Sequence, residues 1–186
     1  MHTLLVLRHA KAAGEPGVND HERPLKGRGR RNATEAGRWL VATSLAPDRV
    51  VCSSSRRTRE TWERVSAALG AAAPDEEGVS FDRRVYDAGA RDLLDIVREQ
   101  PEEAGSVMMV GHNPASHQLA VDLSGRSDFP FPTCALAVIK LSGSWADAVP
   151  GGGELTMYWN PHTLSARGSD PPAPPGETMA PGGKSS

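Results

Sequence analysis

Residues 1–14 read MHTLLVLRHAKAAG, with an apolar run at positions 4–7 that stops abruptly at Arg8 and His9. A short, unbroken apolar run of this kind predicts a buried strand, here over residues 3–7. A core strand ordinarily gives way to glycine, asparagine, aspartate or proline, because those residues suit a turn. A guanidinium and an imidazole at the end of a buried strand instead indicate a functional site, whose other members must come from the rest of the chain.

Strand-like and helix-like patterns alternate along the rest of the sequence. Apolar runs predict further strands at residues 48–52, 79–85, 106–110, 135–141 and 154–158. Apolar residues at helical spacing predict helices at residues 28–45, within 53–70, at 92–98, and from Pro114 onward with Asn113 as the cap. This alternation predicts an α/β fold with helices on both faces of a mostly parallel central sheet. The glycines at 151–153 would join the last two strands as a hairpin, which makes that edge antiparallel.

Length and composition bound the architecture. The chain has 186 residues, of which 38% are hydrophobic and 24% charged, as expected of one globular domain with a sizeable core. Near Ser165 the composition shifts to proline, glycine and small polar residues, which have almost nothing to bury. The sequence therefore predicts a single domain over residues 1–164 and a disordered Pro/Gly-rich tail over residues 165–186.

Charge and cysteine content exclude several classes of function. The formal net charge is -2, so the molecule as a whole is not built to bind nucleic acid or an anionic membrane. The two cysteines, Cys52 and Cys134, cannot form a disulfide framework and indicate buried free thiols in a reducing compartment. No apolar run approaches membrane-spanning length, and the N-terminal run is too short for a signal peptide. We therefore expect a cytoplasmic protein, and we expect it to be a monomer.

Three of the predicted strands bring a basic or imidazole side chain to the carboxyl edge of the sheet. The first ends at Arg8 and His9, the second runs into a helix whose first turn carries Arg57, and the fourth ends at His112. Ligands of open α/β sheets bind outside this edge. Two arginines and two histidines repel one another unless an anion joins them, and a phosphoryl group suits the fork of a guanidinium.

Several motifs, in this order along the chain, resemble those of the histidine phosphatase superfamily. They are LRHAKA at residues 7–12, DHERPLKGRG at 20–29, the SxxxRxxxT spacing at 53–61 and VGHNP at 110–114. Within the superfamily they are most similar to the short phosphohistidine phosphatases of the SixA type, and the resemblance runs from residue 1 to about residue 158. It implies a phosphoglycerate mutase-like fold and a hydrolase with no metal and no cofactor.

The resemblance also implies roles for the residues at this edge. His9 would be the nucleophile that attacks phosphorus and becomes a phosphohistidine, while Arg8, Arg57 and His112 would hold the transferring oxygens. An unperturbed histidine pKa of roughly 6.5 leaves the imidazole substantially neutral near neutral pH. We expect a hydrogen bond to a backbone carbonyl to fix the other ring nitrogen of His9. The superfamily triplet is usually Arg-His-Gly, and Ala10 in third place requires a negative φ there.

Substrate choice depends on whether a carboxylic acid can protonate the leaving group. Larger members of the superfamily keep a glutamate for this purpose after the third strand, whereas this chain has VYDAGARDLL at residues 85–94. Asp87 could serve as the donor, or it could equally be a helix cap or a solvated carboxylate. The candidate substrate-binding residues are Asp87, Asn113 and Arg23, the last of which matches an arginine near the pocket mouth of SixA-like chains.

In the absence of the usual acid, the resemblance favours phosphohistidine on a signalling protein, such as a histidine-containing phosphotransfer domain. Transfer from a substrate imidazole to His9 exchanges one P–N bond for another, so this step is nearly level in energy. Two alternatives stay open. One is a broad-specificity phosphomonoesterase that acts on small phosphorylated metabolites, and the other is a phosphate-binding module without turnover.

Overall fold

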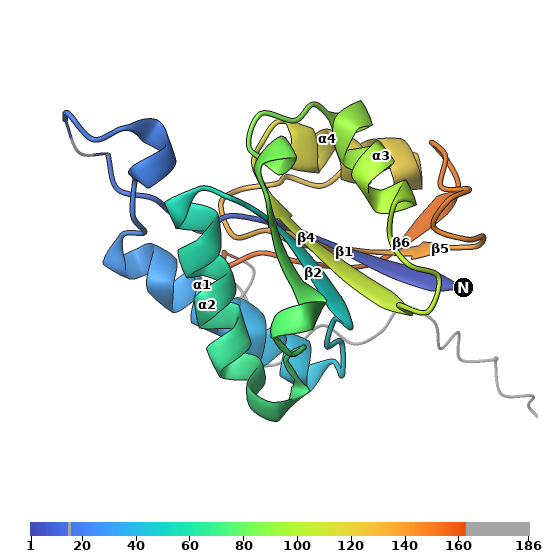
Figure 1. Cartoon of the computed structure of the whole chain (residues 1–186), viewed down its shortest axis with the longest axis horizontal. Helices are drawn as coiled ribbons and strands as arrows, with labels where there is room; N and C mark the ends of the chain where they lie inside the picture. The colour runs from blue at the N-terminus through green and yellow to red at the C-terminus, as the bar shows by residue number, and fades with distance from the viewer. Residues whose placement is uncertain (15, 163–186) are drawn as a thin grey trace, which may run out of the picture.

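The computed structural model describes residues 1–14 and 16–162, and the predicted tail at residues 165–186 lies outside the described residues. A central sheet separates two pairs of helices (Figure 1). One face carries α1 (Gly27–Ala42) and α2 (Arg56–Leu69), and the other carries α3 (Ala90–Arg98) and α4 (Ala115–Ser124). None of the described helices is long and apolar enough to cross a membrane.

Six strands of the described chain form one sheet. They are β1 (His2–Arg8), β2 (Arg49–Ser53), β3 (Val79–Asp82), β4 (Ser106–Gly111), β5 (Leu136–Leu141) and β6 (Gly153–Trp159). Their spatial order is β3-β2-β4-β1-β5-β6, with β5 antiparallel to both of its neighbours and the other pairs parallel. The predicted α/β class, the mostly parallel sheet and the antiparallel edge are therefore confirmed.

Strand β1 runs between the two halves of the hydrophobic core. Leu4 and Val6 pack into the cluster that includes α3 and α4, whereas Leu5 and Leu7 pack into the cluster that includes α1 and α2. All four side chains are fully buried. Side chains alternate between the faces of a strand, so a strand covered on both faces needs apolar residues at consecutive positions. This is why the apolar run at the start of the sequence predicts a central strand.

Helices α1 and α2 approach one another closely at Gly37. A Cβ at this position would lie 2.6 Å from Ala68 Cβ and 2.7 Å from the Val65 carbonyl oxygen, so a larger residue would push the helices apart. Helix α2 ends at Gly70, as predicted, where φ is 58°. Because the first turn of α2 carries Arg57, this packing also determines where its guanidinium lies relative to the sheet.

Two elements end earlier than the sequence pattern predicts. The strand expected to reach residue 85 ends at Asp82, because the Asp82 carboxylate accepts the backbone N–H of Arg84 and turns the chain into a 3-10 helix, η4 (Arg83–Val85). The helix expected to reach residue 45 ends at Ala42, since Ser44 adopts a left-handed φ of 56° that no helix can continue.

The connection between β5 and β6 is longer than the predicted glycine hairpin. Residues 142–152 form it, and Gly151 within it has a φ of 74°. Gly153 already pairs with Leu141 as the first residue of β6, so only two of the three glycines lie in the connection. The other short 3-10 helices of the described chain are η1 (Asp20–Glu22), η2 (Gly70–Ala72) and η3 (Glu76–Gly78).

Candidate active site

The carboxyl ends of β1, β4 and β2 meet at one edge of the sheet. In the parallel pairing of β1 with β4, Arg8 lies opposite Gly111, so the residues that follow, His9 and His112, leave the sheet together. The two imidazole centroids are 5.2 Å apart. Arg57 comes from α2, which follows β2, and its Nη2 lies 3.4 Å from His112 Nδ1. These three residues form one cluster, and the charge of Arg8 acts on both of its imidazoles.

The backbone holds one ring nitrogen of His9. Nδ1 lies 2.8 Å from the Ala10 carbonyl oxygen, which can only accept, so Nδ1 carries the hydrogen and Nε2 keeps its lone pair. The Ala10 amide in turn donates to Thr61 Oγ1 at 3.0 Å. Among the described non-glycine residues, only Ser44 and Cys134 have a positive φ, so position 10 has the backbone conformation that alanine requires. His9 is thus presented with Nε2 as its free nitrogen.

His112 is oriented by the serine of the SxxxRxxxT motif. Its Nε2 lies 2.7 Å from Ser53 Oγ, and Ser53 is fully buried at the end of β2. Because the guanidinium of Arg57 can only donate, Nδ1 of the neutral imidazole accepts and Nε2–H donates to the serine hydroxyl. Nδ1 of His112 therefore points toward Arg57.

Both imidazoles stay neutral far below neutral pH. Burial is the main cause that lowers the pKa of His9 to about 3; the hydrogen bond to the Ala10 carbonyl opposes this shift, and nearby positive charges add to it. Burial also lowers the pKa of His112 to about 4, with the charge of Arg57 as the second cause. A neutral imidazole with a free lone pair is able to attack an electrophile, so His9 is competent as a nucleophile.

These pKa shifts predict that the protein loses stability in acid. A histidine whose folded-state pKa lies below its unfolded value binds more protons when unfolded, so the free energy of unfolding falls as the pH drops from about 6.5 toward the folded-state pKa. Each imidazole adds a slope of at most about 1.4 kcal/mol per pH unit in this window, and less here because His9 and His112 are partly exposed.

Chemical denaturation at a series of pH values measures this slope. His9→Asn should make the dependence of the unfolding free energy on pH shallower, because one of the two depressed groups is gone. His162→Asn, which removes an exposed histidine outside the site, is the matched control. Equal slopes for wild type and His9→Asn would show that His9 titrates normally.

Asp20, which the sequence analysis does not single out, is the anion of this cluster. Its Oδ2 accepts from Arg57 Nη2 at 3.0 Å and from the Tyr86 hydroxyl at 2.7 Å, and its Oδ1 accepts from Arg23 Nη1 at 2.8 Å. The backbone carbonyl of Asp20 also accepts from Arg57 Nη1, at 2.6 Å. The hydrogen bonds from Tyr86 and Arg23 hold the pKa of Asp20 well below its usual range, so the carboxylate is ionised at neutral pH.

Tyr86 is the second residue that the sequence analysis misses. Its ring lies edge-on to His112, with centroids 5.5 Å apart, and 5.8 Å from the Arg57 guanidinium carbon. An aromatic residue beside a predicted strand is typical of the core, so the sequence carries no signal for this role. Asp20 does have a signal, since it opens the DHERPLKGRG motif three residues before Arg23.

Arg8 and Asn113 share an anchor on the loop that precedes β5. Arg8 Nη1 and Asn113 Nδ2 each donate to the Phe131 carbonyl oxygen, both at 2.9 Å. The prediction that Asn113 caps α4 is wrong, because its amide is turned to this loop and Pro114 occupies the cap position. Within the described chain, Arg8 Nε and Asn113 Oδ1 are buried without a hydrogen-bond partner.

Arg23 and Asp87 differ in their relation to the cluster. Arg23 Nε donates to the Ala13 carbonyl at 2.8 Å and its Nη1 reaches Asp20, so Arg23 joins the cluster through Asp20. Asp87 is exposed, and its carboxylate forms no hydrogen bond or ion pair within residues 1–14 and 16–162. In this segment Tyr86 is the residue that donates a hydrogen bond to Asp20 of the cluster.

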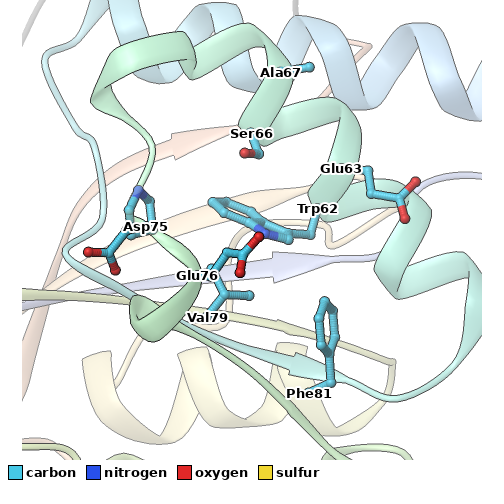
Figure 2. Close-up of a pocket in the computed structure, with 9 residues that line it drawn as sticks. Trp62, Glu63, Ser66, Ala67, Asp75, Glu76, Val79 and Phe81 are labelled. Carbon is cyan, nitrogen blue, oxygen red and sulfur yellow. The ribbon is translucent and has the colours of Figure 1, made fainter.

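A separate hollow of about 630 Å³ lies between α2 and β3. Figure 2 shows the side chains that line it, which include the carboxylates of Glu63, Asp75 and Glu76 and the rings of Trp62 and Phe81. No arginine or histidine is among its lining residues in the described part of the chain. Carboxylates repel an anion, so this hollow does not suit a phosphoryl group.

Sequence comparison relates the chain to one family. The family model of the histidine phosphatase superfamily (branch 1) matches residues 4–80. An uncharacterised protein of Mycobacterium tuberculosis is 34% identical over 165 residues, which cover 83% of this chain and 99% of that protein. An uncharacterised chloroplastic protein of Arabidopsis thaliana is 30% identical over 165 residues, which cover 82% of this chain and 74% of that protein. The family match includes the segments that carry His9, Asp20 and Arg57.

Comparison with solved structures gives the same relationship. A chain from Nakamurella multipartitia, assigned as a phosphohistidine phosphatase SixA, is 34% identical with a TM-score of 0.74, over 86% of this chain and 96% of that one. A chain from Agrobacterium tumefaciens with the same assignment is 26% identical with a TM-score of 0.73, and the match covers 86% of this chain and 98% of that one. The protein histidine phosphatase SixA complexed with tungstate is 22% identical with a TM-score of 0.70, and the match covers 87% of this chain and 99% of that one. This similarity shows a shared fold.

Proposed function

This chain belongs to the histidine phosphatase superfamily and is of the SixA type, and from this premise we propose that it hydrolyses phosphohistidine on a signalling protein, such as a histidine-containing phosphotransfer domain. His9 receives the phosphoryl group. One observation carries the proposal: the Ala10 carbonyl holds Nδ1 of His9, which leaves Nε2 free beside His112 and Arg57.

The first step transfers the phosphoryl group to His9. The Nε2 lone pair attacks phosphorus and forms an N–P bond, while the N–P bond of the substrate breaks and its electron pair returns to the substrate imidazole, which takes up a proton from solvent. The His9 ring becomes cationic, and its Nδ1–H keeps the hydrogen bond to the Ala10 carbonyl. In the second step water attacks phosphorus, the N–P bond of His9 breaks, phosphate leaves and the proton returns to solvent.

The cations around His9 stabilise the charge of the transferring group. In phosphoryl transfer, negative charge is spread over the equatorial oxygens, and catalysis depends on positioning and electrostatic stabilisation. Arg57 and Arg8 supply fixed positive charge. Nδ1 of His112 has to take up a proton before it can donate a hydrogen bond to a phosphoryl oxygen, and the negative charge of the bound group favours that protonation. Ser53 and the Phe131 carbonyl hold these groups in place before the substrate arrives, so little reorganisation is needed.

The carboxylates near the site favour phosphohistidine over a phosphate ester. An ester expels an alkoxide, which gains from a protonated carboxylic acid within reach. Asp20 lies beside Arg57 but is ionised, so it has no proton to give. Asp87 forms no hydrogen bond or ion pair with the cluster in the described chain. An imidazole leaving group has less need of such a donor, because one N–P bond replaces another.

Comparison of kcat/KM for two substrate classes tests this proposal. We expect the value for a phosphorylated histidine-containing phosphotransfer domain to exceed that for common sugar phosphates by at least about a hundredfold. The reason is that only the ester reaction needs a carboxylic acid to protonate its leaving group. Asp87→Asn should change kcat/KM for the phosphoprotein by less than about twofold, because Asp87 is not needed for an imidazole leaving group.

The two alternative functions give different results in the same assay. Preference for sugar phosphates, together with a large loss in Asp87→Asn, would indicate a small-molecule phosphomonoesterase with Asp87 as its acid. Binding of phosphate or tungstate without turnover of either substrate class would indicate a phosphate-binding module.

A further inference from the structure

The guanidinium of Arg57 has two edges that can bind an anion, and Asp20 takes one of them. Nη1 donates to the Asp20 backbone oxygen at 2.6 Å and Nη2 donates to Asp20 Oδ2 at 3.0 Å, which together occupy the end-on edge. Nη2 also lies 3.4 Å from His112 Nδ1. Nε of Arg57 forms no hydrogen bond with the described residues. It is also not one of the side-chain atoms that are fully buried without a partner in the described chain. The side-on edge, Nε with Nη2, is therefore the one that faces His112.

Asp20 is itself fixed from two further parts of the chain. Tyr86 follows η4, and its hydroxyl donates to Oδ2 of Asp20. Arg23 Nη1 donates to Oδ1 of Asp20. Arg23 is in turn held by the Ala13 carbonyl. An arginine that retains only 7% of its accessible surface needs an anionic partner, and Asp20 is the carboxylate that supplies it for Arg57.

We propose that Asp20 is the positioning residue of Arg57: it holds the end-on edge of the guanidinium so that the side-on edge is turned to the phosphoryl group beside His9 and His112. This inference rests on the proposed function, because it concerns the same phosphoryl site. Asp20 does not touch the phosphoryl group, and it acts through Arg57.

A phosphoryl group can bind without displacing Asp20. The carboxylate uses hydrogens of Arg57 that point away from His112, and its three donors keep it in that place. One negative charge also offsets part of the mutual repulsion of Arg57, Arg23 and Arg8 when no substrate is bound. If Asp20 were a substitute for the substrate, it would instead have to leave Arg57 before every turnover.

A double-mutant cycle tests the proposal. Asp20→Ala should lower kcat/KM for the phosphohistidine substrate by about 30- to 100-fold and raise the Kd for tungstate, measured by calorimetry, by about tenfold, because Arg57 is no longer held in register. In an Arg57→Ala background, Asp20→Ala should change either quantity by less than about twofold, since a residue that acts only through Arg57 has nothing left to position.

The control removes another aspartate that pairs with an arginine. Asp95 lies 2.9 Å from Arg98 on α3 and has no part in the site, so Asp95→Ala should leave both quantities unchanged. Asp20→Asn keeps the size of the side chain and should show a smaller loss, and it replaces the alanine variant in the cycle if that variant does not fold.

Two results would overturn the inference. Tighter tungstate binding by Asp20→Ala would show that Asp20 competes with the anion. An equal loss in the wild-type and Arg57→Ala backgrounds would show that Asp20 has only a structural role. Failure of the proposed function is distinguishable from both, because the wild-type protein would then not turn over phosphohistidine while the tungstate cycle would still report on Asp20.

Discussion

His9→Ala is expected to abolish turnover, with kcat/KM for phosphohistidine lowered by at least about ten-thousandfold. The substitution removes Nε2, the nitrogen that the Ala10 carbonyl leaves free, so no covalent intermediate can form. Steady-state kinetics with a phosphorylated phosphotransfer domain measures the loss. The nearby cations are unchanged, so the Kd for tungstate should change by less than about fivefold.

Binding separates loss of the nucleophile from loss of the fold. A His9→Ala protein that binds tungstate and unfolds cooperatively has kept the site and lost only the chemistry. Turnover within tenfold of the wild-type value would mean that another group attacks phosphorus, and the assignment of His9 would be wrong.

Arg57→Ala should lower kcat/KM by about a thousandfold, because it removes a buried charge beside His112, where the proposed function places the transferring oxygens. Arg57→Lys should recover no more than about tenfold of this loss, since an ammonium cannot bind Asp20 with one edge and a phosphoryl oxygen with the other. The same kinetic assay, run on both variants, measures these effects.

The neighbours of Arg57 on α2 supply matched controls. Arg56 pairs with Glu60, and Arg59 donates to the Ser54 carbonyl and lies over the Phe81 ring. Arg56→Ala and Arg59→Ala should each change kcat/KM by less than about threefold, because both side chains are exposed and these partners lie outside the cluster. Equal losses at all three positions would point to a general effect of positive charge, without a specific role for Arg57.

The fold was predictable where one local signal decided the outcome. Consecutive apolar residues in β1 predict a strand covered on both faces, and Gly70 predicts the end of α2. The end of β3 was not predictable, because the sequence pattern favours a strand up to residue 85. The strand ends earlier because the Arg84 amide donates a hydrogen bond to the Asp82 side chain. The order of the strands is a tertiary property, and only the strand-end residues gave an indication of it.

The candidate site likewise contains residues that a local sequence signal predicts and residues that depend on tertiary contacts. His9, Arg57 and His112 follow predicted strands, so topology alone places them at one edge. Asp20 and Tyr86 were missed, since Asp20 follows no predicted strand and an aromatic residue beside a strand is typical of the core. Only tertiary contacts bring the two residues to Arg57 and to one another. Asn113 lies at the site edge, but its amide contacts the Phe131 carbonyl, and no sequence pattern predicts that contact.

Detection of the covalent intermediate tests the central claim most directly. The enzyme is mixed with a radiolabelled phosphohistidine substrate, quenched in base during turnover, where phosphohistidine survives, and mapped by mass spectrometry. We predict label on the peptide that contains His9, at Nε2, appearing and decaying at rates that account for turnover. Turnover with no label on His9, or with the label on another residue, would contradict the account.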